Sequence, residues 1–187
     1  MNNVLVIGNG GREHRIVLSL LASKNVKNLF IINGNGGTVA RNVNISPSNH
    51  EEILKFIKQN EIALTVIGPE APLSEGIVDF LEENGQKVFG PRKAGANLES
   101  SKIFMKEVLT KAGVPTAKYQ AFTSTEEEKA INFINEFKSS VVIKTDGLAA
   151  GKGVVIAESK EEAIKEVKEF FAGKFGDAGK SIVLEEF

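Results

Sequence analysis

Two lysines and a run of glycines form the chemical pattern that stands out in this chain. In "VVIKTDGLAAGKGVVIAES", Lys144 ends a β-branched run, Lys152 lies in a glycine-rich loop, and a second apolar run follows at once. A lysine among valine and isoleucine side chains is costly to bury without an anionic partner, so two solvated surface lysines are the less favoured interpretation. A strand, a glycine loop and a strand predict a hairpin that closes over nucleotide phosphates.

This glycine loop differs from a P-loop. The P-loop motif is G-x-x-x-x-G-K-[ST] leading into a helix. Here three residues separate Gly147 from Gly151, Gly153 follows the lysine, and a strand comes next. The segment is therefore predicted to be a lid over a nucleotide, with backbone N–H groups and lysine charge directed at phosphate oxygens.

A second candidate site lies in "VLVIGNGGREHRI", where glycines separate a strand from a helix. A dinucleotide site needs G-x-G-x-x-G and an acidic residue about 20 residues further on. Glu13 stands at the third glycine position, and the next apolar run ends at Asn33 and Gly34. Because glycine N–H groups at a helix N-terminus still bind anions, the loop predicts a phosphate or carboxylate site rather than a dinucleotide site.

The elements that would position this loop alternate between strands and helices. Such a rhythm predicts an α/β fold with a mostly parallel sheet covered by helices. The expected strands are residues 4–7, 29–32, 64–67 and 87–89, and the expected helices are residues 12–22, 51–59 and 76–84. Ser48 and Glu51 have the spacing of a capping box, which makes His50 a solvated residue of the first helical turn.

A turn-forming loop follows each of the four expected strands. These loops are residues 8–14, 33–38, 68–73 and 90–91. Ligands of parallel sheets bind at the carboxyl ends of the strands, so the four loops are expected to line one pocket. Each loop taken alone is equally consistent with a simple turn.

The pattern changes after residue 91, where a helical stretch connects to a second module. Ile103, Phe104, Val108 and Leu109 mark its apolar side, and Gly113 closes it. The second module is expected to contain strands at residues 119–122, 141–145, 154–157 and 181–185 and helices at residues 125–137 and 160–171. The two domains are predicted to be residues 1–100 and 101–187.

Composition narrows the class of protein. The 187 residues are 42% hydrophobic and carry a net charge of −1, which argues against nucleic acid or an anionic membrane as the main partner. No run approaches the roughly 20 apolar residues of a membrane span. The absence of cysteine excludes thiolate chemistry, and the start of the chain lacks a signal peptide pattern, so we expect a cytoplasmic protein that acts on small molecules.

Several motifs together resemble those of the glycinamide ribonucleotide synthetase family of the ATP-grasp superfamily. They are "GNGGREH", "GNGGT", "VIGPEAPL", "LESSK", "GVPTA", "VIKTDGLAAGKGV" and "FGDAGKSIVLEEF", and they cover the whole chain in order. The resemblance implies a Rossmann-like pre-ATP-grasp domain that holds substrate. It further implies that a partial ATP-grasp domain with a small α+β lid follows.

The resemblance also implies a reaction. ATP would phosphorylate the carboxylate of glycine, and the amino group of 5-phosphoribosylamine would displace the phosphate to form glycinamide ribonucleotide. The implied cofactors are ATP and Mg²⁺ or Mn²⁺, with the metal ligands beyond residue 187. This chain alone is then expected to be the N-terminal part of an enzyme, and its protein partners stay open.

The residues that match the family's nucleotide site come from three segments. Lys144 and Lys152 are implied to be catalytic. The implied ATP-binding residues are Lys102, Lys144, Gly147, Leu148, Ala149, Gly151, Lys152, Gly153, Glu185 and Glu186. No metal ligand is expected within the chain.

We hypothesise that the loops of the first sheet bind the amine substrate, 5-phosphoribosylamine. Glycine N–H groups would hold the sugar phosphate, and a carboxylate such as Glu70 would face the amine. The candidate residues are Gly10, Gly11, Arg12, Glu13, Asn35, Gly36, Gly37, Pro69 and Glu70.

Other classes of protein share parts of these patterns. Another ATP-grasp carboxylate–amine ligase, or a biotin-dependent carboxylase subunit, would have a similar sheet and lid but different rim loops. An NAD-binding Rossmann-type regulatory module would use the first loop, although Glu13 at the third glycine position disfavours it. A fragment without activity is the remaining alternative.

Overall fold

The computed structural model describes residues 1–149 and 152–187. The chain divides into two compact units, Met1–Ala96 and Asn97–Phe187. The division falls within helix α5 (Lys93–Ser100). Each unit has its own sheet and its own hydrophobic core.

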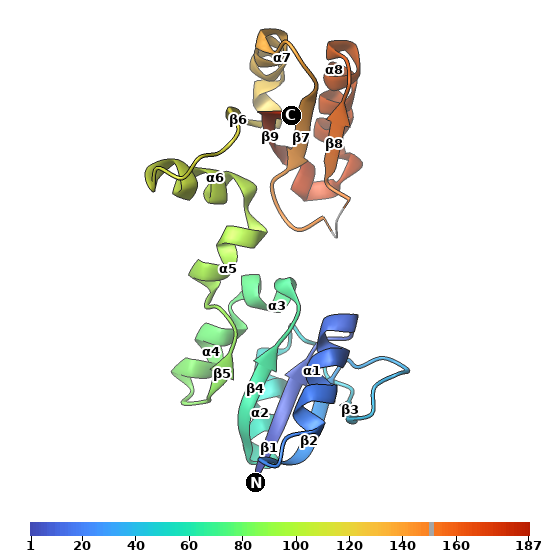
Figure 1. Ribbon diagram of the computed structural model, residues 1–187, viewed down its shortest axis with the longest axis vertical. Coiled ribbons are helices and arrows are strands. Elements are labelled where there is room, and N and C mark those ends of the chain that lie inside the picture. The colour runs from blue at the N-terminus through green and yellow to red at the C-terminus, as the bar shows by residue number, and fades with distance from the viewer. Residues whose placement is uncertain (150–151) are drawn as a thin grey trace. The chain divides into compact units, whose positions relative to one another are not determined.

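The first unit is built on a parallel sheet of five strands in the order β3-β2-β1-β4-β5 (Figure 1). Its elements are β1 (Asn2–Ile7), α1 (Gly11–Leu21), β2 (Val26–Ile32), β3 (Arg41–Val43), α2 (His50–Gln59), β4 (Ile62–Ile67), α3 (Glu70–Glu75), α4 (Ile77–Glu83) and β5 (Val88–Phe89). The chain order reverses between β1 and β4, as in a Rossmann-like sheet. The predicted parallel α/β sheet is therefore confirmed.

The two faces of this sheet are buried by different helices (Figure 1). Leu5 and Ile7 of β1 pack with α2 and α4, whereas Val4 and Val6 pack with Val17 of α1. Successive strand residues point to opposite faces, so a strand covered on both sides must be apolar throughout. This explains the continuous run "VLVI".

Several local expectations for the first unit were incomplete or wrong. The helix expected at residues 76–84 begins at Ile77. A separate helix, α3, ends at Glu75 and is capped by Gly76, whose φ of 96° favours glycine. The cap of α2 is Asn49, which accepts the N–H of Glu52, rather than Ser48. His50 is not simply solvated, because its ring packs 5.6 Å from that of Phe80.

The second unit contains an antiparallel sheet of four strands in the order β6-β9-β7-β8. Its elements are α6 (Lys102–Lys111), β6 (Tyr119–Thr123), η1 (Ser124–Glu126), α7 (Glu127–Glu136), β7 (Val141–Thr145), β8 (Val154–Ala157), α8 (Lys160–Glu169), η2 (Phe170–Lys174), η3 (Gly176–Lys180) and β9 (Ser181–Glu186). The four predicted strands are confirmed. Helix α8 is capped by Ser159, which accepts the N–H of Glu162.

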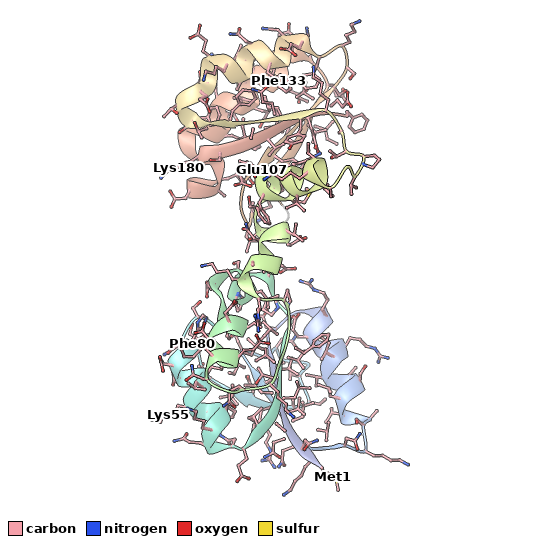
Figure 2. The ribbon with its side chains drawn as sticks, turned by 90° about the vertical axis from the view of Figure 1, so that its left-hand side faces the viewer. Met1, Lys55, Phe80, Glu107, Phe133 and Lys180 are labelled. Carbon is pink, nitrogen blue, oxygen red and sulfur yellow. The ribbon has the colours of Figure 1, made fainter. Side chains whose placement is uncertain are left out.

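Helices α7 and α8 cover one face of this sheet and build its core. Val141 and Ile143 of β7 point into that core, as does Phe133 of α7, labelled in Figure 2. Alternation along β7 places Lys144 on the opposite face, where α6 lies against β9. The apolar layer of α7 and α8 therefore holds the strand that presents Lys144.

Candidate functional site

Three loops of the first unit meet at the carboxyl ends of β1, β2 and β4. The side-chain amide of Asn35 donates to the carbonyl of Asn9 at 2.6 Å and joins the second loop to the first. The guanidinium of Arg12 donates to the carboxylate of Glu70 at 2.6 Å and joins the third loop to the first. The residues proposed from the sequence to bind the amine substrate all lie on these loops or in the first turn of the helix that follows: Gly10, Gly11, Arg12, Glu13, Asn35, Gly36, Gly37, Pro69 and Glu70.

The fourth loop, predicted to line the same pocket, has a different environment. A Cβ at Gly90 would lie 3.0 Å from the side chain of Leu73 and 3.3 Å from that of Val78. Gly90 therefore packs against α3 and α4. The hydrogen bonds that join the first three loops are made by residues of those loops, Asn9, Arg12, Asn35 and Glu70. We refer to these three loops as the candidate rim.

Glu13 is turned into the fold beneath the first loop. Its side chain is buried, with 3% of the residue exposed, and its Oε2 accepts the N–H of Gly10 at 2.7 Å. The same side chain fills the space beside Gly8 and Gly68, where an added Cβ would come within 2.5 Å and 2.2 Å of Glu13. Glu13 thus supports the loop from below, and its carboxylate does not face solvent.

The ends of Arg12 and Glu70 lie at the surface of the rim. Their side chains are 68% and 38% exposed. The hydrogen bond from Arg12 is the main reason why the pKa of Glu70 lies below that of an ordinary glutamate, and a backbone hydrogen bond at its own position adds to this. Glu70 is consequently ionised at neutral pH and can pair with a cationic group of a ligand.

The loop after β2 is shaped by its own polar groups. The Oδ1 of Asn35 accepts the N–H of Gly37 at 2.9 Å, and the Oγ1 of Thr38 accepts the N–H of Asn35 at the same distance. Gly36 is exposed, with open space around the position of a Cβ. The side chain of Asn35 therefore forms hydrogen bonds both within this loop and to the carbonyl of Asn9. In the loop after β4, Pro69 is the N-terminal cap residue of α3.

In the second unit, the strand register brings Lys144 and Glu185 onto one face. Lys144 lies opposite Val183 and Glu185 lies opposite Val142, so the two side chains are diagonal neighbours on adjacent strands. The ammonium of Lys144 forms an ion pair with Oε1 of Glu185. Lys106 of α6 forms an ion pair with Oε2 of the same carboxylate.

These three side chains differ in their access to solvent. Lys106 and Glu185 each have 6% of the side chain exposed, whereas Lys144 has 25%. Burial lowers the pKa of Lys144 below that of an ordinary lysine, and the cations of Lys106 and Lys102 lower it further. A cluster of cations around one carboxylate attracts a further anion.

A cavity of about 230 Å³ opens beside this cluster within the second unit. The ammonium-bearing side chains that line it are those of Lys102, Lys106 and Lys144. The remaining lining residues are Leu98, Glu99, Met105, Val154 and Val183. Apolar walls with a few convergent charges are typical of a small-molecule site.

The root of the glycine loop is tied to the start of α6. Oδ1 of Asp146 accepts the N–H of Ile103 at 3.1 Å and the hydroxyl of Ser101 at 3.0 Å. Nζ of Lys102 donates to the carbonyl of Gly147 at 3.3 Å. Because an acceptor at a helix N-terminus satisfies N–H groups that the helix leaves unpaired, Asp146 fixes α6 and the loop to each other.

The predicted lid residues have distinct environments. Gly147 has a φ of 126°, which favours glycine, and a Cβ at Gly153 would lie 2.1 Å from Oγ1 of Thr145. Leu148 and Lys152 are exposed, and the carbonyl of Ala149 accepts the N–H of Lys152 at 2.9 Å. Gly151, also predicted to bind nucleotide, lies outside the described residues.

The acidic pair at the end of β9 divides between two environments. Glu185 is buried between two lysines, whereas Glu186 is exposed and its Oε1 accepts the N–H of Lys118 at 3.0 Å. Sequence reasoning missed Lys106 and Asp146. The spacing of Lys102 and Lys106, one helical turn apart, would have placed both on the side of α6 that carries Lys102.

Metal ligation and membrane insertion have clear structural tests. Among residues 1–149 and 152–187, no group of three or more His, Cys, Asp or Glu side chains is arranged to hold a metal ion. Within that same part of the chain, the helices are too short or too polar to cross a membrane.

Two family descriptions divide the chain between them. Residues 2–99 match "Phosphoribosylglycinamide synthetase, N domain", and residues 100–187 match "Phosphoribosylglycinamide synthetase, ATP-grasp (A) domain". This chain belongs to the phosphoribosylglycinamide synthetase family. The resemblance noted in the sequence motifs is thereby confirmed.

Individual members of the phosphoribosylglycinamide synthetase family match almost the whole chain. Phosphoribosylamine–glycine ligase of Haemophilus influenzae is 45% identical over 190 residues, and that of Streptococcus pneumoniae is 47% identical over 188 residues. These alignments cover 99% and 98% of this chain, and in both cases 44% of the relative. The chain thus spans less than half the length of these relatives.

Solved structures show the same fold. The crystal structure of phosphoribosylamine–glycine ligase from Thermotoga maritima aligns with a TM-score of 0.79 and 34% identity, covering 99% of this chain and 44% of that one. The biotin carboxylase domain of the Hydrogenobacter thermophilus 2-oxoglutarate carboxylase aligns with a TM-score of 0.76 and 22% identity, covering 100% and 44%. At this lower identity the second likeness shows the fold alone.

Proposed function

We propose that this chain contributes to the ATP-dependent ligation of glycine to 5-phosphoribosylamine, which yields glycinamide ribonucleotide, ADP and phosphate in purine biosynthesis. The observation that carries the proposal is the lysine-lined cavity of the second unit, in a chain of the phosphoribosylglycinamide synthetase family. Lys102 and Lys144 suit a polyphosphate because both are cations at the edge of that cavity. ATP would supply the phosphoryl group that makes the glycine carboxylate reactive.

The roles of the second unit's residues follow from their positions. Lys144 would neutralise the negative charge that shifts between phosphate oxygens during phosphoryl transfer. Lys102 of α6 would bind the same phosphate groups. The backbone of residues 147–149 and of Gly153, together with Lys152 in the loop, would cover the nucleotide and exclude water. Glu185 would act through the lysines that it pairs with, and Glu186 stays proposed at the adenine side. A divalent metal such as Mg²⁺ or Mn²⁺ belongs to this proposal.

The first unit is proposed to hold the amine substrate. The N–H groups of Gly11 and Gly36 would bind a sugar phosphate, since α1 begins with its positive dipole end at this rim. The ionised carboxylate of Glu70 would orient the amine. We accordingly propose that residues 1–100 form a substrate domain and that residues 101–187 begin an ATP-grasp domain. The protein would act on small molecules in the cytoplasm.

The test uses the protein expressed from its complete reading frame. Lys144→Met is expected to reduce ATP-dependent formation of glycinamide ribonucleotide by at least about 100-fold, because a fixed positive charge at the phosphates is lost. Lys111→Met, on the exposed end of α6, serves as the matched control and is expected to keep wild-type activity. Circular dichroism checks that both variants fold. Normal product formation by Lys144→Met contradicts the assignment.

The NAD-binding alternative makes a different prediction. The buried side chain of Glu13 fills the space beside Gly8 and Gly68. A dinucleotide-binding Rossmann site has a third glycine at the position of Glu13, so that the helix packs closely against the strand. Thermal stabilisation by MgATP and not by NAD is therefore expected, and the reverse result would favour a dinucleotide-binding module.

A further inference from the structure

Lys106 is a buried cation to which the family motifs assign no role. Its side chain is 6% exposed, and its ammonium donates to Oγ1 of Thr116 at 2.7 Å. The same ammonium pairs with Oε2 of Glu185 and lies 5.2 Å from the centroid of the Tyr119 ring. A lysine with this many partners in a buried position is held in one place.

Glu185 is shared between two lysines, one on each oxygen. Lys106 takes Oε2 and Lys144 takes Oε1, so the three groups together carry one net positive charge. Both lysines line the cavity, but Lys106 and Glu185 each have only 6% of the side chain exposed, whereas Lys144 has 25%. Of the two lysines, Lys144 is thus the one with access to solvent.

Because Glu185 is shared with Lys106, the free-energy cost of moving Lys144 from Glu185 to an anionic ligand is lowered. If Lys144 were the sole partner of Glu185, its movement toward a phosphate would leave a buried carboxylate without a counter-charge, which is strongly unfavourable. With Lys106 on Oε2, the carboxylate keeps an ion pair throughout. Lys144 can then exchange Glu185 for a ligand at low cost.

We propose that Lys106 is a positioning residue of the nucleotide site, which neutralises Glu185 and thereby releases Lys144 to bind a nucleotide phosphate. This inference rests on the proposed function, because it assumes that the cavity takes MgATP. Lys106 acts through Glu185 and Lys144. Its Nζ is retained by Thr116 and Glu185 and is not needed as a direct ligand.

The decisive test is a double-mutant cycle on the protein expressed from its complete reading frame. In Lys106→Met, Glu185 has only Lys144 as a partner and retains it, so the Kd for MgATP measured by calorimetry should rise about 10- to 100-fold. In Lys106→Met/Glu185→Gln, the neutral amide no longer retains Lys144. The double variant should return to within about threefold of the wild-type Kd.

A merely structural role for Lys106 predicts a different result. Loss of packing would make the two substitutions additive, and the double variant would bind MgATP no better than Lys106→Met. Such additivity overturns the proposal. Lys106→Arg keeps the charge and is expected to retain binding close to the wild type, whereas Lys111→Met controls for loss of a lysine from α6.

Kinetics give a second readout on the same variants. Lys106→Met should raise the KM for ATP with a smaller change in kcat, since Lys144 is still present once ATP is bound. If Lys106→Met does not fold, Lys106→Gln, which keeps a polar group beside Thr116, takes its place: a rise of about fivefold or more in the Kd for MgATP supports the proposal, and a smaller change overturns it. Failure of the wild-type protein to bind MgATP would instead refute the proposed function.

Discussion

The two units present different chemical groups to an anionic ligand. The rim of the first unit offers backbone N–H groups around glycines, supported from below by the buried Glu13 and edged by one exposed ion pair. The cavity of the second unit offers lysine ammonium groups arranged around one buried carboxylate. A backbone site depends on the packing beneath it, whereas a side-chain site depends on which charges compensate one another.

In a protein of residues 1–187 the unfolding of the two units can be measured separately, because tyrosine reports on one unit only. The sequence contains one tyrosine and no tryptophan, and Tyr119 lies on β6 of the second unit. Tyrosine fluorescence therefore follows unfolding of the second unit, while circular dichroism follows both.

The largest effect is expected at Gly153. Gly153→Ala places a Cβ 2.1 Å from Oγ1 of Thr145 and 2.7 Å from Cβ of Ala149, at the point where β7 and β8 pair. Forcing these atoms apart should lower the free energy of unfolding of the second unit by about 2–3 kcal/mol. Urea unfolding followed by Tyr119 fluorescence measures this loss.

The same substitution in the first unit is its control. Gly11→Ala adds a Cβ with nothing within 4 Å, so the stability of the first unit should change by less than about 0.5 kcal/mol. Equal losses in the two variants would contradict the steric explanation for Gly153.

The next effect concerns the support beneath the first rim. Glu13→Ala removes the acceptor of the Gly10 N–H and leaves a void beside Gly8 and Gly68. The first unit should lose about 1–3 kcal/mol, measured by circular dichroism, while the Tyr119 transition stays in place. Glu13→Gln keeps an acceptor oxygen and most of the volume, and should recover much of the loss. A shift of the Tyr119 transition by Glu13→Ala would show that the units do not unfold separately.

A smaller and more selective effect is expected at Glu70. Glu70→Gln removes the charge proposed to face the amine, so the KM for 5-phosphoribosylamine should rise about tenfold, and more than the KM for ATP. Steady-state kinetics on the protein from the complete reading frame measure both values. A larger rise in the KM for ATP would move Glu70 out of the amine site.

The smallest effect concerns the pairing of Arg12 with Glu70. Arg12→Ala should raise the pKa of Glu70 toward that of an ordinary glutamate, 4.5, which carboxyl-detected NMR measures. A carboxyl whose pKa is lowered by folding stabilises the fold above its unfolded pKa and loses that contribution as the pH falls through its folded pKa. Arg12→Ala should therefore cost at most about 0.5 kcal/mol at pH 7, because the pair is exposed, and nothing at pH 2. An unchanged pKa would show that the ion pair does not form in solution.

Local patterns predicted most of the framework. Apolar runs such as "VLVI" mark strands reliably because a sheet covered on both faces leaves no room for polar side chains there. β3 was missed because Arg41 and Asn42 are exposed at an edge and carry no apolar signal. Gly76 was placed inside a helix, since residue type alone does not show that its backbone is left-handed.

The candidate sites were predicted to the level of loops but not of contacts. Lys144 and the glycine loop carry their own signal, whereas the partners of Lys106 come from the loop before β6 and from the last strand. Residue order does not reveal such a meeting. In the same way, the sequence places Glu13 in the first loop without showing that its side chain points inward.

The packing around Glu13 also restricts how this region can change over generations. Gly8, Gly68 and Glu13 occupy one shared volume, in which an added methyl group at either glycine would collide with the glutamate side chain. A larger residue at position 68 is tolerable only with a shorter residue at position 13, whereas Gly8 has a φ of 129° and its added Cβ would also lie 2.9 Å from Cδ of Pro69. Among homologous chains, positions 13 and 68 should thus vary together, and position 8 should stay glycine.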